Sequence, residues 1–179
     1  NKKKCWTNCP FLFSECYYYR QLYEIFQNSK FHRDFDYFFA FKKDSFITAE
    51  KDIKIHAKYT QSLLASKDID KKSLIYLLLH SLFCNKLDLS LSSGNPLNSD
   101  IFDEFDRVKR ELMDNLLIND IERVCSYLFS LDKESPRTIH IVVDNAGLEF
   151  FSDICLVLYL LSAHIASTVV IHLKVLLFQ

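Results

Sequence analysis

The sequence predicts a mixed α/β chain that is helical through residue 134 and continues, over residues 135–179, as the start of a parallel α/β/α domain. Apolar side chains recur at helical spacing through the first part. After Pro136, two β-branched runs flank an apolar helical stretch, which is the pattern of a β-α-β unit. The chain holds 2 glycines and 3 prolines in 179 residues, which argues against an all-β fold because tight turns use both residue types.

The charge balance argues against a protein that binds nucleic acid or membranes nonspecifically. Lys and Arg number 22 against 23 Asp and Glu, for a formal net charge of -1, and such binding needs an excess of basic charge. The N-terminal run of three lysines is followed by Cys5 and Trp6 rather than by the apolar core of a signal peptide, so we expect a cytoplasmic protein. Its cysteines are then reduced, and Cys125 and Cys155 fit small core positions.

Helices are expected through most of residues 1–134. Apolar spacing predicts the first over 12–26 and a second over 49–64, and a near-continuous apolar run predicts a buried helix over 74–83. A Ser- and Asn-rich loop follows over 87–100, and another amphipathic helix over 102–112.

The last helix of this region is expected to begin at an asparagine cap. Asn119 would be the N-cap, and Glu122, three residues on, would complete a capping box. Its buried face would hold Ile121, Val124, Cys125 and Leu128.

The sequence of residues 135–179 predicts a strand, a helix and a second strand. Thr138–Val143 and Thr168–Leu173 are β-branched runs, and both are expected to be buried on two faces, as in the parallel sheet of a Rossmann-like domain. Leu148–Ala163 is the intervening helix. The inward side chains of this helix would be Phe151, Ile154, Cys155 and Leu158. Residues 154–178 are long and apolar, but their change from Leu-rich to β-branched favours a helix followed by a strand over a membrane span.

The polar turn after the first strand is the main candidate site. Ligands of doubly wound sheets bind at the carboxyl ends of the strands, where Asp144 and Asn145 lie. A carboxylate beside an amide oxygen suits Mg²⁺ or Mn²⁺. Gly147 can open the turn, and Glu149 falls in the first turn of the following helix. The alternative is that Asp144 or Asn145 only caps that helix, and spacing alone leaves both interpretations open.

A second polar cluster follows the buried helix over residues 85–90. Asn85 and Asp88 could line a pocket, although such residues at a helix end are more often capping and turn residues. The six histidines are scattered, and none pairs at ligand spacing along the sequence.

Four segments of the chain resemble segments of the domain-of-unknown-function-89 family, also called damage-control phosphatases, and they occur along the chain in the same order as in the family. Residues 139–151 (IHIVVDNAGLEFF) resemble its DNAG-x-E segment, and residues 15–20 (ECYYYR) its N-terminal ECYxYR helix. Residues 82–90 (LFCNKLDLS) resemble its L-W-G-N-K-x-D-L-S segment, with Phe and Cys in place of Trp and Gly. Residues 171–174 (IHLK) resemble its second strand, which continues in the family into P-W-F-V-S-D.

The resemblance implies a helical domain followed by a Rossmann-like domain, and a metal-dependent phosphatase acting on sugar phosphates such as fructose phosphates. It implies Mn²⁺ first, with Mg²⁺, Co²⁺ or Ni²⁺ as candidates. Carried over, Asp144 is catalytic, Asp144 and Asn145 bind metal, and these two with Glu149 contact the substrate. The family's third metal ligand has no counterpart before Gln179, so we expect these residues to belong to a longer protein and to be inactive alone.

Two other functions stay open at this stage. One is carboxyl methyl transfer from S-adenosylmethionine, a reaction claimed for part of the family. The absence of a Gly-rich loop after Thr138–Val143 weakens it, because adenosyl cofactors usually need close backbone approach. The other is a non-catalytic helical interaction module.

Overall fold

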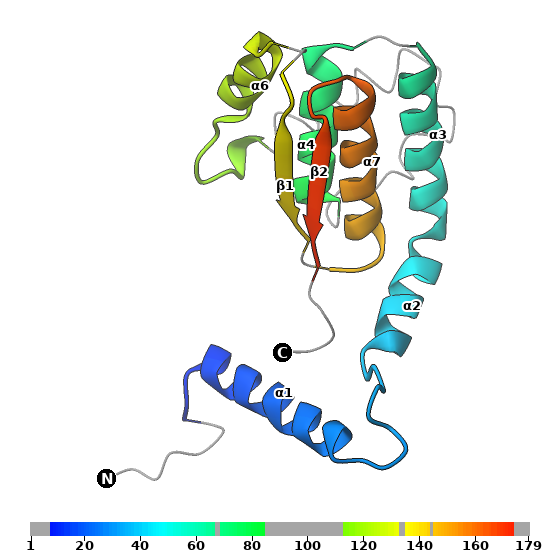
Figure 1. Ribbon diagram of the computed structural model, residues 1–179, viewed down its shortest axis with the longest axis vertical. Helices are drawn as coiled ribbons and strands as arrows, with labels where there is room; N and C mark the ends of the chain where they lie inside the picture. The colour runs from blue at the N-terminus through cyan, green and yellow to red at the C-terminus, as the bar shows by residue number, and fades with distance from the viewer. Residues whose placement is uncertain (1–7, 67–68, 85–112, 133–134, 144, 174–179) are drawn as a thin grey trace. The chain divides into compact units, whose positions relative to one another are not determined.

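The computed structural model describes residues 8–66, 69–84, 113–132, 135–143 and 145–173. It divides into two compact units, residues 1–40 with 173–179 and residues 41–172, and each is described by itself. The described elements (Figure 1) are α1 (Phe11–Gln27), α2 (Phe39–Thr48), α3 (Glu50–Ser66), α4 (Lys71–Phe83), α6 (Ile121–Ser130), β1 (Thr138–Val142), α7 (Leu148–Ser162) and β2 (Thr168–His172). The prediction of a helix-rich α/β chain with parallel strands is therefore confirmed.

In the first unit, α1 forms where the aromatic periodicity predicts it. Tyr37 stacks on two rings of this helix, with centroid distances of 6.4 Å to Tyr19 and 5.6 Å to Phe26. Phe38 meets Tyr19 edge-on at 5.2 Å. The segment after α1 thus folds back onto the helix through aromatic contacts, which favour such offset and edge-on geometries.

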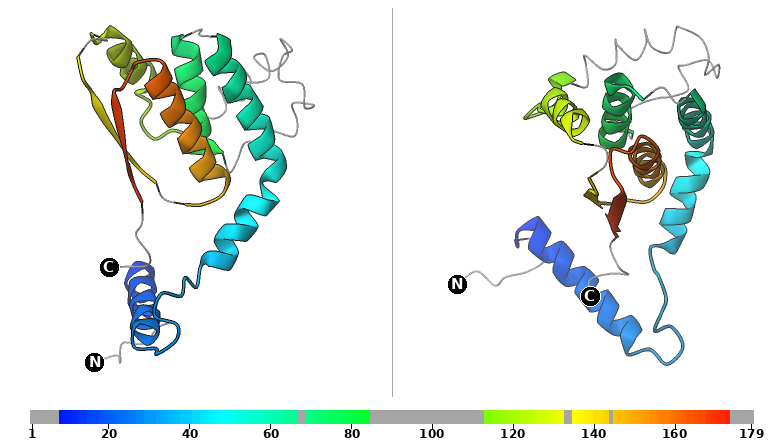
Figure 2. Two further views of the ribbon diagram at one scale, coloured as in Figure 1. Left: turned by 45° about the vertical axis from the view of Figure 1, so that its right-hand side comes forward. Right: turned by 45° about the horizontal axis from the view of Figure 1, so that its top comes forward.

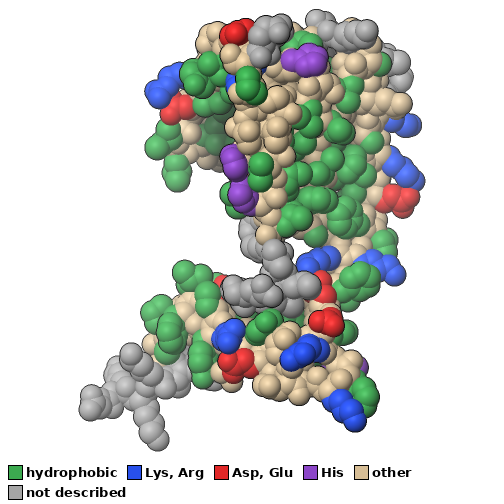
Figure 3. Space-filling view, viewed as in Figure 1, with side chains coloured by type: hydrophobic (Ala, Val, Ile, Leu, Met, Phe, Trp, Pro, Cys, Tyr) green, Lys and Arg blue, Asp and Glu red, His purple; other side chains and the backbone are tan. Residues whose placement is uncertain are grey.

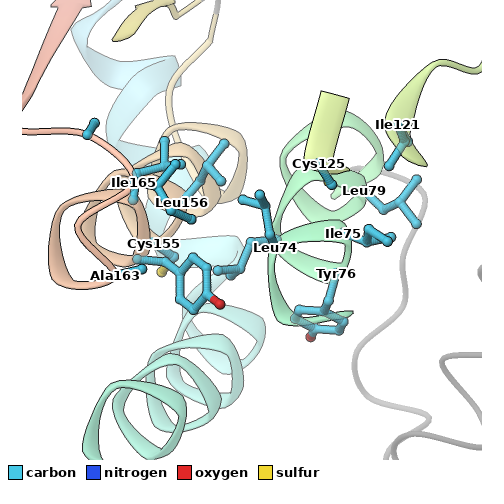
Figure 4. Close-up of a cluster of buried hydrophobic side chains, with 14 of the residues drawn as sticks. Leu74, Ile75, Tyr76, Leu79, Ile121, Cys125, Cys155, Leu156, Ala163 and Ile165 are labelled. Atoms are coloured by element: carbon cyan, nitrogen blue, oxygen red, sulfur yellow. The ribbon is translucent and has the colours of Figure 1, made fainter. Parts of the chain in front are cut away.

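In the second unit, α4 is the central helix. Its apolar run forms a buried helix as predicted, and Leu74, Leu77 and Leu79 are fully buried. Figure 4 shows Leu74 and Leu156 pointing toward one another between α4 and α7, with Ile121 and Cys125 of α6 on the other side of α4. Cys125 and Cys155 lie in this core, as the sequence predicts. Burial of about ten such side chains, at roughly 1.5–3 kcal/mol each, is the largest contribution to the stability of this helix packing.

Polar groups fix where α4 begins. The Asp70 carboxylate caps the helix by accepting a hydrogen bond from the Ser73 amide at 2.6 Å. The Tyr159 hydroxyl of α7 donates to the Asp70 carbonyl at 2.8 Å and accepts from the Asp70 amide at 3.1 Å. Because both backbone groups of Asp70 bond to one side chain of α7, the start of α4 is fixed against α7.

The two strands pair in parallel, as predicted, and α7 connects them. The register runs from Thr138 opposite Thr168 to Val142 opposite His172. Figure 2 shows α4 and α7 on one side of the strands. On that side Ile139 and Ile141 pack against the core, whereas Val142 on the other side is exposed.

The expectation that both strands are buried on two faces is wrong for the described residues. Exposed and half-buried side chains alternate along β1, and in β2 the end residues Thr168 and His172 are exposed with half-buried residues between them, because the described helices cover one face only.

The start of α6 also differs from the predicted capping box. Asp120 is the N-cap and makes no side-chain capping bond, while Asn119 Oδ1 accepts from the Ile121 amide at 3.3 Å. Glu122 reaches the Lys71 ammonium at 2.6 Å instead of the cap. The salt bridge to α4 replaces the local bond, which is a tertiary contact that helix-start rules do not include.

Two residues that the sequence predicts to face the core are exposed. One observed helix, α2, was not predicted. Val124 and Leu158 are each 44% exposed, because neighbouring elements cover α6 and α7 on a narrower stripe than the apolar pattern suggests. Helix α2 has no buried residue, and its apolar residues form no stripe at helical spacing, so periodicity does not predict it. The predicted loop at 87–100 and helix at 102–112 lie outside the described residues.

The long apolar C-terminal stretch is a helix and a strand, as predicted. Helix α7 ends at Ser162 and β2 begins at Thr168. Within the described parts of the chain, no helix combines the length and apolar character that a membrane span requires.

A buried histidine pair lies between α3 and α4. His56 and His80 stack with ring centroids 4.1 Å apart, and Phe151 of α7 meets His56 edge-on at 6.1 Å. None of the four ring nitrogens has a hydrogen-bond partner in the described structure. Burial lowers the pKa of His56 to about 4, and burial with the neighbouring His56 lowers that of His80 well below its usual value.

This pair predicts a loss of stability in acid. Above the unfolded-state pKa of 6.5 both rings are neutral in both states and the full free energy of unfolding is present. Below pH 6.5 the unfolded chain binds protons that the folded chain refuses, so the free energy falls by about 1.4 kcal/mol per pH unit for each histidine, down toward pH 4 for His56.

Chemical denaturation between pH 8 and 4.5 measures this slope. The His56→Phe/His80→Phe double variant should lack this component, and the exposed-histidine variant His140→Asn should retain it. An unchanged slope in the double variant would contradict the assignment.

Candidate active site

The candidate site begins where β1 ends. The Val143 amide donates to the His172 carbonyl at 3.0 Å, which extends the strand pairing by one bond. The chain then turns into α7 through Gly147, whose φ of 74° and ψ of -140° lie in a region open to glycine. A Cβ at this position would lie 2.8 Å from Ser45 Oγ. Both the backbone conformation and the space therefore require glycine here.

Asn145 and Glu149 are brought together by this turn. Asn145 is exposed and its Nδ2 donates to Glu149 Oε2 at 3.0 Å, and Glu149 is half-buried in the first turn of α7. Gly147, the N-cap of α7, has no side chain that could cap the helix, and the Asn145 amide two residues earlier donates to Glu149. The predicted residues Asp144, Asn85 and Asp88 lie outside the described residues.

The first turn of α7 adds favourable electrostatics to the site. The amides of a first turn have no partner within their helix and carry the positive end of the helix dipole. The carboxylate of Glu149 lies in this turn, where the dipole stabilises negative charge. An anion such as a phosphate group would be stabilised in the same way.

Sequence reasoning missed a second carboxylate of α7. Ser81 Oγ of α4 donates to Asp153 Oδ1 at 2.5 Å, and Asp153 is 8% exposed. Burial raises the pKa of Asp153, the Ser81 bond lowers it, and the nearby Glu149 raises it. The signal in the sequence was an acidic residue directly before a long apolar run of the helix, since Asp153 is followed by residues 154–161, all apolar.

The fold also pairs histidines that are far apart in the sequence. His140 Nδ1 and His172 Nε2, on neighbouring strands, lie 2.8 Å apart. Figure 3 shows two adjacent histidine side chains on the surface in this view. Among the described residues, no group of three or more His, Cys, Asp or Glu side chains is placed to hold a metal ion.

These features define an α/β protein with polar residues gathered where its first strand leads into a helix. The chain belongs to the family of the damage-control phosphatase ARMT1-like domain, whose model matches residues 3–176. The resemblance drawn from the sequence is thereby confirmed.

Several relatives carry the name damage-control phosphatase ARMT1. Those of Bos taurus, Rattus norvegicus and Xenopus tropicalis are 33%, 33% and 34% identical to this chain over 178, 179 and 179 residues. The alignments cover 93%, 95% and 94% of this chain. They cover 40% of each relative, so the chain spans about two fifths of the length of the curated relatives that it matches.

The turn geometry predicts the effect of Gly147→Ala. A side chain at this φ costs about 1–3 kcal/mol, and the new Cβ would press on Ser45 Oγ, which is held by its bond to the Lys42 carbonyl at 2.7 Å. We expect the free energy of unfolding, measured by urea titration, to fall by at least the backbone cost.

A Ser45→Ala/Gly147→Ala variant separates the two causes. It should recover the part of the steric cost that comes from Ser45 Oγ and keep the backbone cost, while Ser45→Ala alone should stay within about 0.5 kcal/mol of the parent chain. Full stability in Gly147→Ala would show that the turn adopts another conformation.

Proposed function

We propose that this region forms the metal-binding part of a phosphatase that hydrolyses small phosphomonoesters such as sugar phosphates, including fructose phosphates. The observation that carries the proposal is the turn from β1 into α7, which joins Asn145 to Glu149 directly after Asp144. The family name, damage-control phosphatase, supports phosphate-ester hydrolysis as the reaction class.

The donor set favours a hard divalent cation. Asp144 would supply a carboxylate and Asn145 its amide oxygen, and oxygen ligands of this kind suit Mn²⁺, our first candidate, or Mg²⁺, with Co²⁺ and Ni²⁺ as substitutes. The bond from Asn145 Nδ2 to Glu149 fixes which end of the amide is oxygen. When bound, such a cation supplies Lewis acidity toward the phosphoryl group and toward water.

The chain's own groups would then bind and orient the substrate. Glu149, held in place by Asn145, would accept a hydrogen bond from a substrate hydroxyl group. The first-turn amides of α7 would offset negative charge on the phosphate. Asp144 would be the catalytic carboxylate, and Asn85 and Asp88 would contribute from the segment that follows α4.

The proposal also covers the domain architecture, the binding partner and the cellular location. We propose that β1 and β2 are strands of a larger Rossmann-like parallel sheet in residues 135–179 and beyond, and that residues 1–134 form a helical domain. The exposed face of the two strands supports a larger layered sheet, because parallel sheets are usually covered on both faces. The near-zero net charge argues against nonspecific binding to nucleic acid or membranes, and we propose a small phosphorylated metabolite as the partner and the cytoplasm as the location.

The test is phosphate release from fructose 1-phosphate by the full-length gene product with Mn²⁺. Asp144→Ala should abolish metal-dependent turnover, because it removes the one carboxylate of the pair, while stability changes by no more than a few kcal/mol. Asp114→Ala, which removes an exposed carboxylate elsewhere, is the matched control and should keep full activity.

Two further arms make the result decisive. Residues 1–179 assayed alone should be silent, because the family's third metal ligand has no counterpart among them. Metal-dependent turnover that survives Asp144→Ala would place the chemistry elsewhere. Methyl transfer from labelled S-adenosylmethionine without phosphate release would favour the methyltransferase alternative.

A further inference from the structure

Three polar side chains lie in a row from the turn before α7 into the first two turns of this helix. Glu149 and Asp153 are four residues apart within α7 and are neighbours on its surface, and Asn145, two residues before the Gly147 N-cap, meets Glu149 through a hydrogen bond. Asn145 is bonded to Glu149, and Glu149 influences Asp153 electrostatically. The row runs from the exposed turn to the buried Asp153, so the proposed site continues inward along α7.

Asp153 stands out because it is a carboxylate in the interior. It is 8% exposed, and the next residues of α7, Cys155 and Leu156, belong to the core. Burying a carboxylate is unfavourable unless hydrogen bonds satisfy it. A core role alone would be met better by an apolar side chain, so the buried carboxylate needs another explanation.

The partner of Asp153 supplies that explanation. Ser81 lies in the last turn of α4, 72 residues away in sequence, and its hydroxyl donates to Asp153 at 2.5 Å. The bond therefore ties the end of α4 to α7 one helical turn after Glu149. It also holds the Asp153 carboxylate toward α4, although Glu149 on the same face carries the same charge.

We propose that Ser81 and Asp153 are positioning residues for the phosphatase site: their hydrogen bond fixes the α7 face from which Glu149 and Asn145 meet the substrate. The inference rests on the proposed function for the reaction and on described contacts for the geometry. Without the bond, α7 would keep its leucine core but lose the tie that sets the position of its first two turns against α4.

The first readout needs no activity. The side-chain amide resonances of Asn145, observed with ¹⁵N-asparagine labelling of the full-length gene product, report its bond to Glu149. Ser81→Ala and Asp153→Ala should both shift them toward the values of exposed asparagines. Asp153→Asn, whose amide oxygen can still accept from Ser81, should shift them less. Ser62→Ala, which removes an exposed serine bonded to the Lys58 carbonyl, is the matched control and should leave them unchanged.

The second readout is the split between KM and kcat for the sugar phosphate with Mn²⁺. Ser81→Ala should raise KM about tenfold, the scale of one lost hydrogen bond to a charged group, and change kcat less. In a Glu149→Ala background the same substitution should leave KM unchanged, because the group that it positions is gone. A merely structural role would instead lower stability equally in both backgrounds without moving KM.

The outcomes separate the two proposals. If the parent protein releases no phosphate with any of the four metals, the proposed function fails, and the Asn145 resonances alone decide the positioning role. Unchanged resonances in both Ser81→Ala and Asp153→Ala would overturn the inference, as would a KM effect that persists at full size without Glu149. If Asp153→Ala fails to fold, the Asn145 resonances of Ser81→Ala and Asp153→Asn test the positioning role.

Discussion

The parallel pairing of β1 with β2 is the constraint on which the candidate site depends. Two parallel strands end at the same edge of a sheet, so the helix that joins them must start beside that edge and run back along one face. Here Val142 pairs with His172 at the ends of the strands, and α7 starts five residues after Val143. The strand pairing therefore brings Asn145 and Glu149 to the strand ends, and the hydrogen bond between them adds to this placement.

Helix α4 is the platform that holds α7 in this position, and polar ties fix it at both ends. At its start, Tyr159 bonds to both backbone groups of Asp70, and in its last turn Ser81 bonds to Asp153. Between these ties the contact is apolar and centred on Leu74. Apolar packing tolerates small sliding better than directional hydrogen bonds do, so we assign the bulk of the stability to the core and the alignment of the helices to the two ties.

The sequence predicted what is locally encoded and missed what depends on distant neighbours. The predicted ends of the two strands and of α7 lie within one residue of the observed ends, because β-branched runs and helical periodicity are local signals. The sequence placed Glu149 near the turn but did not predict its bond to Asn145, because Asn145 lies before the Gly147 N-cap, where helical spacing does not apply. The Ser81–Asp153 bond was not predicted either, since its partners lie 72 residues apart, and α2 lacks the apolar stripe that a pattern search needs. The two histidine pairs likewise depend on contacts between distant residues, which no local pattern contains. The roles of Asp144 and the domain boundary at residue 134 also depend on such contacts, and both stay predictions.

The central claim is that the turn after β1 binds a divalent cation through Asp144 and Asn145. The most direct measurement is anomalous scattering at the manganese edge from crystals of the full-length gene product grown with Mn²⁺. The account predicts one strong peak within coordination distance of the Asp144 carboxylate and the Asn145 amide oxygen, with the Asn145 amide nitrogen still directed at Glu149. A manganese peak bound by other residues, with this turn empty, would contradict it.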